Sequence, residues 1–156
     1  MLSYFSSIIF GEEEPTDPTS DSDDDLNTED PEYQVLKTFK QVLRNGIDFR
    51  QHGITKPSVT IHLTFHKGVL YWSGGRPITN QLREIVIKDL KFIEVGKSTN
   101  GFSDHGTALG VDPALCFSLI TSMGDSLDLE TSSNQERDAC VQGFSMLIAA
   151  SQNGAE

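Results

Sequence analysis

The sequence predicts a mainly β domain with one helix before the strands and one after them. Residues 59–66 alternate apolar and polar side chains, which is the period of a strand with one buried face. Further short apolar runs follow, separated by turn residues. Residues 31–44 and 136–148 instead repeat apolar side chains at the spacing of one helical face. Seven short strands and a closing helix favour an antiparallel sandwich or partly open barrel that the last helix caps.

The first helix is expected to begin at Pro31 and to end at Asn45-Gly46. Asp30 is a suitable N-cap, proline is favoured at the first helical position, and Glu32 lies in the first turn. A glycine just after the last helical residue is a common helix stop. The apolar face consists of Val35, Leu36, Phe39, Val42 and Leu43.

Seven segments are expected to form strands. The alternating run at 59–66 is the clearest, and residues 66–68 form the expected turn into a strand at 69–72. Met123-Gly124 are expected to turn between the last two strands. The other candidates are the weaker segment 47–52 and the segments 84–87, 90–95, 115–121 and 126–130.

The final helix has a recognisable start. Ser133, with Glu136 three residues later, forms a capping box, in which each side chain bonds a free backbone N–H of the first turn. The apolar stripe that follows consists of Cys140, Val141, Phe144, Leu147 and Ile148. We therefore expect an amphipathic helix with one face packed on the sheet.

The negative charge is concentrated in one segment. The 156 residues contain 12 Lys and Arg against 23 Asp and Glu, and 11 of these acids lie within residues 12–32, where Leu26 is the one large apolar side chain. Such a segment cannot bury enough apolar surface to offset its ordering entropy, so we expect disorder. The remaining residues are electrically balanced. Without a basic excess we expect no nucleic-acid binding, which depends on many phosphate contacts.

The strand and helix pattern resembles that of a known family. The second half of a pleckstrin homology (PH) domain is similar to residues 83–99 (REIVIKDLKFIEVGKST), 115–120 (LCFSLI), 126–130 (SLDLE) and 136–148 (ERDACVQGFSMLI). Residues 46–53 (GIDFRQHG), Lys56-Pro57 and 69–72 (VLYW) fit the first half more loosely. The most similar type occurs in phosphoinositide-specific phospholipases C and related adaptor proteins. The resemblance implies two near-orthogonal antiparallel sheets, a capping helix and a binding function without catalysis.

The resemblance also implies a site for phosphoinositide headgroups. Family members commonly bind them between the loops of the first two strands, through a Lys in the first strand and Arg-x-Arg or Lys-x-Arg in the second. Here Thr60 and His62 stand where that basic pair belongs, and histidine is mostly neutral near pH 7. We therefore expect weak binding of anionic headgroups at most. The candidate residues are Arg50, His52, Lys56 and His62, with Lys67 and Arg76 on the rim.

Cys140 is a second departure from the family pattern. A Trp usually stands at this place in the last helix and packs on the sheet. Cysteine is much smaller, so either neighbouring side chains fill the space or the helix is less firmly seated. Cys140 and Cys116 are the two cysteines of the chain, and we expect both to be reduced and buried.

Other motifs carry no site. Residues 96–99 (GKST) resemble the end of a phosphate-binding loop, but Lys91 stands where that motif needs its first glycine. His62 and His66 lie on one predicted strand, where four residues span roughly 13 Å, too far for one metal ion. His105 lies in ordinary loop composition. We expect no metal, no cofactor and no catalytic residues.

Aromatic side chains offer a second kind of contact. Tyr71 and Trp72 are neighbours on a predicted strand, so one faces the core and the other faces out. Phe92 and Phe102 have the same ambiguity. Exposed rings would favour contact with a protein partner.

Four segments and two functional hypotheses follow. The segments are a short apolar stretch from Met1 to Phe10, the acidic linker at 11–31, the PH-like domain at 32–151 and a disordered end at 152–156. The first hypothesis is a cytoplasmic adaptor that reaches membranes peripherally through weak phosphoinositide binding. The alternative is a protein-interaction scaffold whose partner binds Met1 to Phe10 or the exposed aromatic rings. Residues 1–10 are too short to span a membrane and lack the features of a secretory signal.

Overall fold

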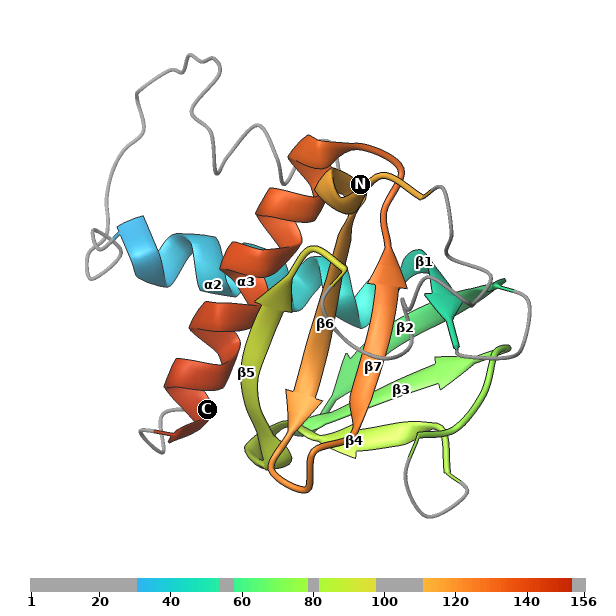
Figure 1. Ribbon diagram of the computed structural model, residues 1–156. Coiled ribbons are helices and arrows are strands. Elements are labelled where there is room, and N and C mark those ends of the chain that lie inside the picture. The colour runs from blue at the N-terminus through green and yellow to red at the C-terminus, as the bar shows by residue number, and fades with distance from the viewer. Residues whose placement is uncertain (1–30, 54–57, 79–81, 98–110, 153–156) are drawn as a thin grey trace.

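The computed structural model describes residues 31–53, 58–78, 82–97 and 111–152. Between helices α2 (Pro31–Asn45) and α3 (Asn134–Gln152), seven strands form one antiparallel sheet (Figure 1). The expectations for residues 1–30, the loop with Lys56, the loop with Phe102 and His105, and residues 153–156 lie outside the described residues. The strands are β1 (Ile47–His52), β2 (Val59–His66), β3 (Val69–Ser73), β4 (Glu84–Val86), β5 (Leu90–Val95), β6 (Cys116–Thr121) and β7 (Ser126–Glu130).

The strand order in the sheet is β4-β3-β2-β1-β7-β6-β5. Strands β2, β3 and β4 run across strands β5, β6 and β7, so the sheet curves strongly upon itself (Figure 1). Strands β4 and β5 are its two edges, and they do not pair with each other, which leaves the barrel partly open. This architecture confirms the predicted fold class.

The turns follow from local backbone chemistry. Lys67 and Gly68 both have positive φ, 50° and 81°, as the tight turn between β2 and β3 requires. At the end of α2, Gly46 has φ of 104° and donates its N–H to the carbonyl of Val42 at 2.9 Å. The predicted helix stop and the predicted hairpin are therefore confirmed.

Two strand boundaries were predicted too long. Ile87 belongs to a single turn of 3-10 helix, η2 (Ile87–Asp89), and Leu115 ends another, η4 (Pro113–Leu115). In η4 the carboxylate of Asp112 accepts the N–H of Ala114 at 2.9 Å, which favours a turn over an extended strand. An apolar run alone does not distinguish these two conformations.

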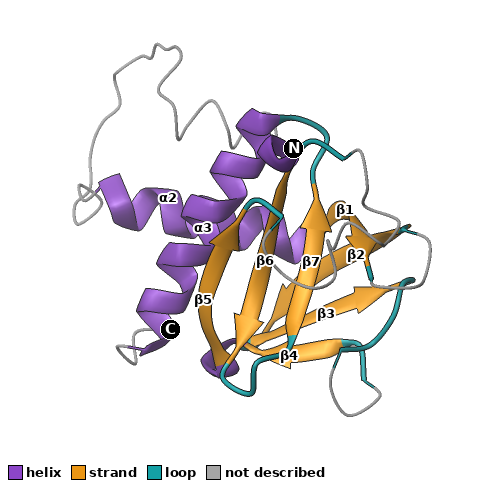
Figure 2. Cartoon of the chain, viewed as in Figure 1, coloured by secondary structure: helices purple, strands orange, loops and turns teal. Residues whose placement is uncertain are grey.

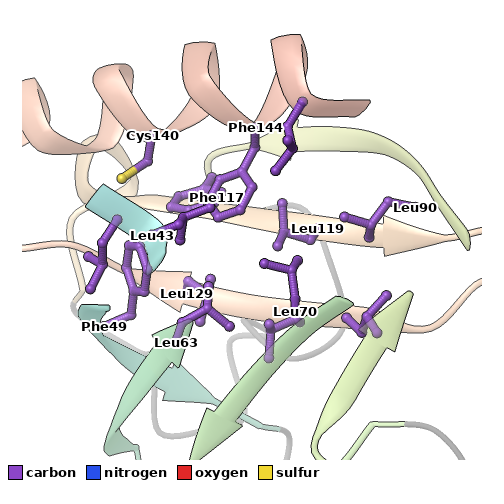
Figure 3. Close-up of a cluster of buried hydrophobic side chains, with 14 of the residues drawn as sticks. Leu43, Phe49, Leu63, Leu70, Leu90, Phe117, Leu119, Leu129, Cys140 and Phe144 are labelled. Carbon is purple, nitrogen blue, oxygen red and sulfur yellow. The ribbon is translucent and has the colours of Figure 1, made fainter. Parts of the chain in front are cut away.

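The core lies between the curved sheet and α3 (Figure 3). Leu63 of β2, Leu119 of β6 and Leu129 of β7 are fully buried. Leu63 and Leu129 alternate with polar side chains on the other face of their strands, whereas β6 is buried along nearly its whole length. Helix α3 packs against β5 and β6. One half of its predicted capping box is present, because Ser133 Oγ accepts the N–H of Glu136 at 3.1 Å, whereas the Glu136 carboxylate accepts the N–H of Ser132, at 3.3 Å, one residue before the predicted partner. Helix α2 packs against β2 and α3, and in Figure 2 it passes behind β5 and β6, whereas α3 lies beside β5.

Neighbouring aromatic rings fill the space around Cys140. Cys140 is fully buried and points into the cluster that contains Phe117 (Figure 3). Phe144, one turn later, meets Phe39 of α2 edge to face, with ring centroids 4.9 Å apart, and Phe117 at 6.0 Å. A Cβ placed on Gly143 would lie 2.4 Å from the Phe39 ring, so glycine is what allows α2 to approach α3 this closely. Of the two alternatives for Cys140, the structure therefore shows a filled core.

Candidate binding surfaces

The end of the sheet where β1 meets β2 carries most of the predicted headgroup residues. In the β1–β2 hairpin, Arg50 pairs with Thr60 and Asp48 pairs with His62. Side chains of alternate residues share a face of a strand. Arg50, His52 and His62 therefore all lie on the outer face of the hairpin, opposite the core.

Arg50 is bound locally. Its Nε and Nη2 atoms donate to the hydroxyl of Ser58, at 3.2 and 2.8 Å. The side chain is exposed, and Arg50 also pairs across the strands with Glu130 of β7. An anion binding here would compete with the Ser58 contact and meet a neighbouring carboxylate.

Both histidines of the predicted site face carboxylates. His52 is almost fully buried, and its Nε2 lies 2.8 Å from Glu130 Oε1. His62 is exposed, and its Nδ1 lies 2.7 Å from Asp48 Oδ1. Because each ring already has an acidic partner, any positive charge on it is offset within the protein rather than available to a phosphate.

Arg76 reaches the same end of the sheet from the segment after β3. Its backbone is clamped by Gln51, whose amide donates to the Arg76 carbonyl at 2.9 Å and accepts the Arg76 N–H at 2.6 Å. Trp72 also donates to this carbonyl, at 3.0 Å. The guanidinium lies over Gly53, where an added Cβ would be 2.7 Å from Nη2. His52 and Arg76 consequently line one hollow of about 300 Å³.

This hollow is not purely cationic. Asp125 and Asp128 line it together with His52 and Arg76. Asp128 is buried and accepts a hydrogen bond from the Ser118 hydroxyl at 2.7 Å. Two carboxylates among the described lining residues lower the attraction for a phosphate group.

Lys67 lies apart from the other candidates. It is in the turn at the far end of β2, whereas Arg50, His52 and Arg76 lie near the start of that strand. Val59 and His66, the two ends of β2, are seven steps apart along the strand, which corresponds to about 23 Å. The structure thus brings His52 and Arg76 together, places Arg50 and His62 on the adjoining outer face, and separates Lys67 from all four.

The aromatic side chains divide as the alternation predicts. Trp72 is buried in the core, and its neighbour Tyr71 is exposed, as is Phe92 of β5.

Burial also shields both thiols. It raises the pKa of Cys116 to about 12, with Glu130 as the next cause, and it raises the pKa of Cys140 above its usual range. Neither described thiol is therefore a ready nucleophile near neutral pH.

A larger groove lies between β4 and the turn that joins β6 to β7, and it was not predicted from the sequence. Its volume is about 640 Å³. Leu82, Val86 and Met123 line it with exposed apolar surface, and Glu84 lines it with a carboxylate. The available signal in the sequence was Met123, an apolar side chain within the predicted turn between the last two strands.

The described residues include neither a membrane-spanning helix nor a cluster of metal ligands. No helix within the described ranges is long and apolar enough to cross a bilayer. Across the same ranges, no three His, Cys, Asp or Glu side chains are grouped so that they could hold a metal ion.

Comparison with known proteins shows similarity in fold. No protein-family model and no curated protein matches the sequence. Among solved structures, Inner Membrane Complex sub-compartment protein 1 (ISP1) from Toxoplasma gondii matches with a TM-score of 0.59 and 16% identity, over 84% of this chain and 100% of that one. Sub-compartment protein 3 (ISP3) from the same organism matches with a TM-score of 0.53 and 9% identity, over 75% and 85%. The PH domain from TgAPH has a TM-score of 0.47 and 10% identity, over 74% and 89%. The curved seven-stranded sheet with its capping helix is the PH-like architecture that the sequence predicted, and the likeness to ISP1 and ISP3, at these identities, extends to the fold alone.

Proposed function

We propose that this chain is a non-catalytic PH-like module that binds a protein partner. The observation that carries the proposal is the pairing of the predicted headgroup residues with acids. His52 contacts Glu130 and His62 contacts Asp48, at 2.8 and 2.7 Å. A headgroup site needs several cations that converge on two or more phosphates, and forked Arg donors serve this best. Here the strand position for such a pair carries Thr60 and His62 instead.

A weak phosphoinositide site is the second candidate. It is favoured by one observation, the shared hollow of His52 and Arg76 at the end of the sheet where the family resemblance places a headgroup. Peripheral membrane attachment and the likeness to the phospholipase C type of PH domain belong to this candidate. The two carboxylates in the hollow weigh against it.

Vesicle sedimentation separates the two candidates. The full chain is mixed with phosphatidylcholine vesicles that contain or lack phosphatidylinositol 4,5-bisphosphate, at low salt, where such contacts are strongest. We expect equal sedimentation with both kinds of vesicle. Phosphoinositide-dependent sedimentation that Arg76→Gln abolishes would refute the proposal. Lys67→Gln is the matched control, because it removes one charge from the far end of β2.

The N-terminal segment has its own test. The scaffold hypothesis assigns a partner contact to the apolar stretch from Met1 to Phe10, on a linker that contains 11 carboxylates within residues 12–32. Deleting residues 1–29 removes the apolar stretch and most of the acidic segment, and keeps α2 together with Asp30, its expected N-cap. If vesicle binding arises only after this deletion, the acidic segment shields a lipid site, and the protein-binding proposal fails.

A further inference from the structure

We propose that the groove between β4 and the β6–β7 turn binds an extended peptide that carries both Lys or Arg and apolar side chains. This inference rests on the proposed function and names the kind of partner. In Figure 1, β4 lies at the edge of the sheet next to the turn that joins β6 to β7. The lining residues come from both walls, with Glu84 and Val86 on β4 and Met123 and Asp125 on the turn.

The groove exposes apolar surface that would gain from being covered. Leu82 is 51% exposed, Val86 is 42% exposed and Met123 is 85% exposed. All three line the groove. Exposed apolar side chains gathered around a concave surface are typical of binding sites, and methionine adapts to partners of different shape.

The charge of the groove selects the partner. Glu84, Asp89 and Asp125 contribute three carboxylates, and the described lining residues include no Lys, Arg or His. Arg83, next in sequence to Glu84, donates to the carbonyl of Gly75 at 3.3 and 3.1 Å, so its guanidinium is held there. A partner with cationic side chains would complement this surface.

The backbone of β4 offers hydrogen bonds to an extended chain. Arg83 accepts from Trp72 at 3.1 Å, and Ile87 donates to Gly68 at 2.8 Å, so the odd-numbered positions bond β3. In an antiparallel pair alternate residues make the ladder bonds. The N–H and C=O groups of Glu84 and the N–H of Val86 therefore point away from β3, along the free edge of the sheet, where a peptide can add as a strand. The C=O of Val86, the N-cap of η2, accepts the first hydrogen bond of that turn.

Charge also argues against two other occupants. The segment from Met1 to Phe10 is followed by the 11 acids of residues 12–32, which the three carboxylates of the groove would repel. Anionic lipid headgroups would be repelled for the same reason. A cationic and apolar peptide satisfies the charge, the apolar surface and the open strand edge together.

Val86 allows a specific test of the strand edge. Its φ is −69°, which is the value that proline requires, and its N–H makes no ladder bond to β3. Val86→Pro therefore removes the free edge donor and leaves the pairing of β4 with β3 in place. Val86→Ala is the matched reference, because it removes apolar surface at the same position and keeps the N–H, so the additional loss with Val86→Pro reports the backbone donor.

The charge has a matched test as well. Asp89→Asn with Asp125→Asn removes two negative charges from the groove. Gln142→Lys with Ser145→Lys shifts the net charge by the same amount on exposed positions of α3, neither of which lines the groove. The urea unfolding transition of each variant shows whether its fold is intact.

The experiment starts with a displayed library of random short peptides, selected on the immobilised full chain. We expect enriched peptides to combine Lys or Arg with apolar residues. Fluorescence anisotropy with a labelled, enriched peptide should show affinity reduced about tenfold by Val86→Pro and by the double Asn variant. The double Lys variant should change the affinity less than about threefold, and Val86→Ala should weaken binding less than Val86→Pro does.

The outcomes separate the groove from the wider proposal. Two results would refute peptide binding at the groove but not the proposal that the chain binds a protein partner. They are enriched peptides without a cationic bias, and enriched peptides whose affinity Val86→Pro does not change. No enriched peptide, together with phosphoinositide-dependent vesicle binding, would overturn both. Self-association in sedimentation velocity that Val86→Pro abolishes would make a second copy of the chain the occupant, and would overturn the peptide inference.

Discussion

Replacing Gly143 by alanine should destabilise the protein, although alanine is the better helix former. Gly143 lies inside α3, where glycine is about 1 kcal/mol less favourable than alanine. An added Cβ would lie 2.4, 2.5 and 2.6 Å from three ring carbons of Phe39. These distances are about 1 Å shorter than ordinary carbon contacts.

The ring of Phe39 cannot move away easily. Phe39 is fully buried, and its ring contacts that of Phe144 edge to face at 4.9 Å. Overpacking a core of this kind costs about 1–3 kcal/mol, and loosening the aromatic pair adds about 0.5–1.5 kcal/mol. After subtraction of the helix-propensity gain of about 1 kcal/mol, Gly143→Ala should lower the free energy of unfolding by about 0.5–3.5 kcal/mol.

A double-mutant cycle tests the cause. Phe39→Ala alone should lower the free energy of unfolding by about 3–5 kcal/mol. This loss does not exceed the total free energy of unfolding of most domains, about 5–15 kcal/mol. In that background the clash is gone, and Gly143→Ala should raise the free energy of unfolding by about 1 kcal/mol. Urea unfolding followed by the fluorescence of Trp72, which is the one tryptophan and is buried, measures all four proteins.

The sign of the effect is the decisive result. Gly143→Ala could instead stabilise the protein equally in the wild-type and the Phe39→Ala backgrounds. That result would refute the inference that a side chain at position 143 clashes with the ring of Phe39. Ser145→Ala, at an exposed position of the same helix, is the control for helix propensity alone. It should stabilise slightly in both backgrounds.

Three further perturbations test other parts of the fold. Gln51→Leu should cost about 1–3 kcal/mol in urea unfolding, because the N–H of Arg76 loses its 2.6 Å acceptor. Gly46→Ala should cost about 1–2 kcal/mol, because φ is 104° and the new Cβ would displace the ring of His62. The raised pKa of Cys116 should make the free energy of unfolding fall as pH rises from 9.0 towards about 12, because only the unfolded state releases the thiol proton there.

Each of these tests has a control in the same chain. Gln142→Leu, at an exposed position of α3, should leave stability nearly unchanged. Gly124→Ala also places alanine at a positive φ, 93°, but nothing lies within 4 Å of its Cβ, so it should cost less than Gly46→Ala. Cys116→Ala should reduce the pH dependence above pH 9, while below that pH the thiol is protonated in both states and adds no slope. An unchanged dependence would contradict the assignment to this thiol.

The fold could be predicted because most of its elements are encoded locally. The period-two alternation at 59–66 requires one buried face, and β2 buries Ile61 and Leu63 accordingly. The same rule predicted that Tyr71 and Trp72 would separate, and Trp72 is the buried one. The single turns at Ile87 and Leu115 could not be predicted, because three residues are too few for a period.

The candidate sites depend on contacts that are distant in the sequence. The carboxylate that contacts His52 belongs to Glu130, 78 residues later in the sequence. Glu130 lies on β7, which pairs with β1 through a long-range contact of the folded sheet. A sequence shows which cations are present but not which carboxylates will meet them. Asp48 is the exception, since the hairpin register alone places it opposite His62. The groove at β4 depends on the β6–β7 turn in the same long-range way.

The packing of Phe39 against α3 determines where a fragment of this chain that folds on its own can begin. A fragment that begins at Ile47, the first residue of β1, would keep every strand and the closing helix. It would also leave the rim of Phe144 and the surface at Gly143 facing water, because the side chain that covers them belongs to α2. The smallest autonomous piece of this protein is therefore a sheet flanked by two helices, and a transplant or minimal domain should begin no later than Pro31.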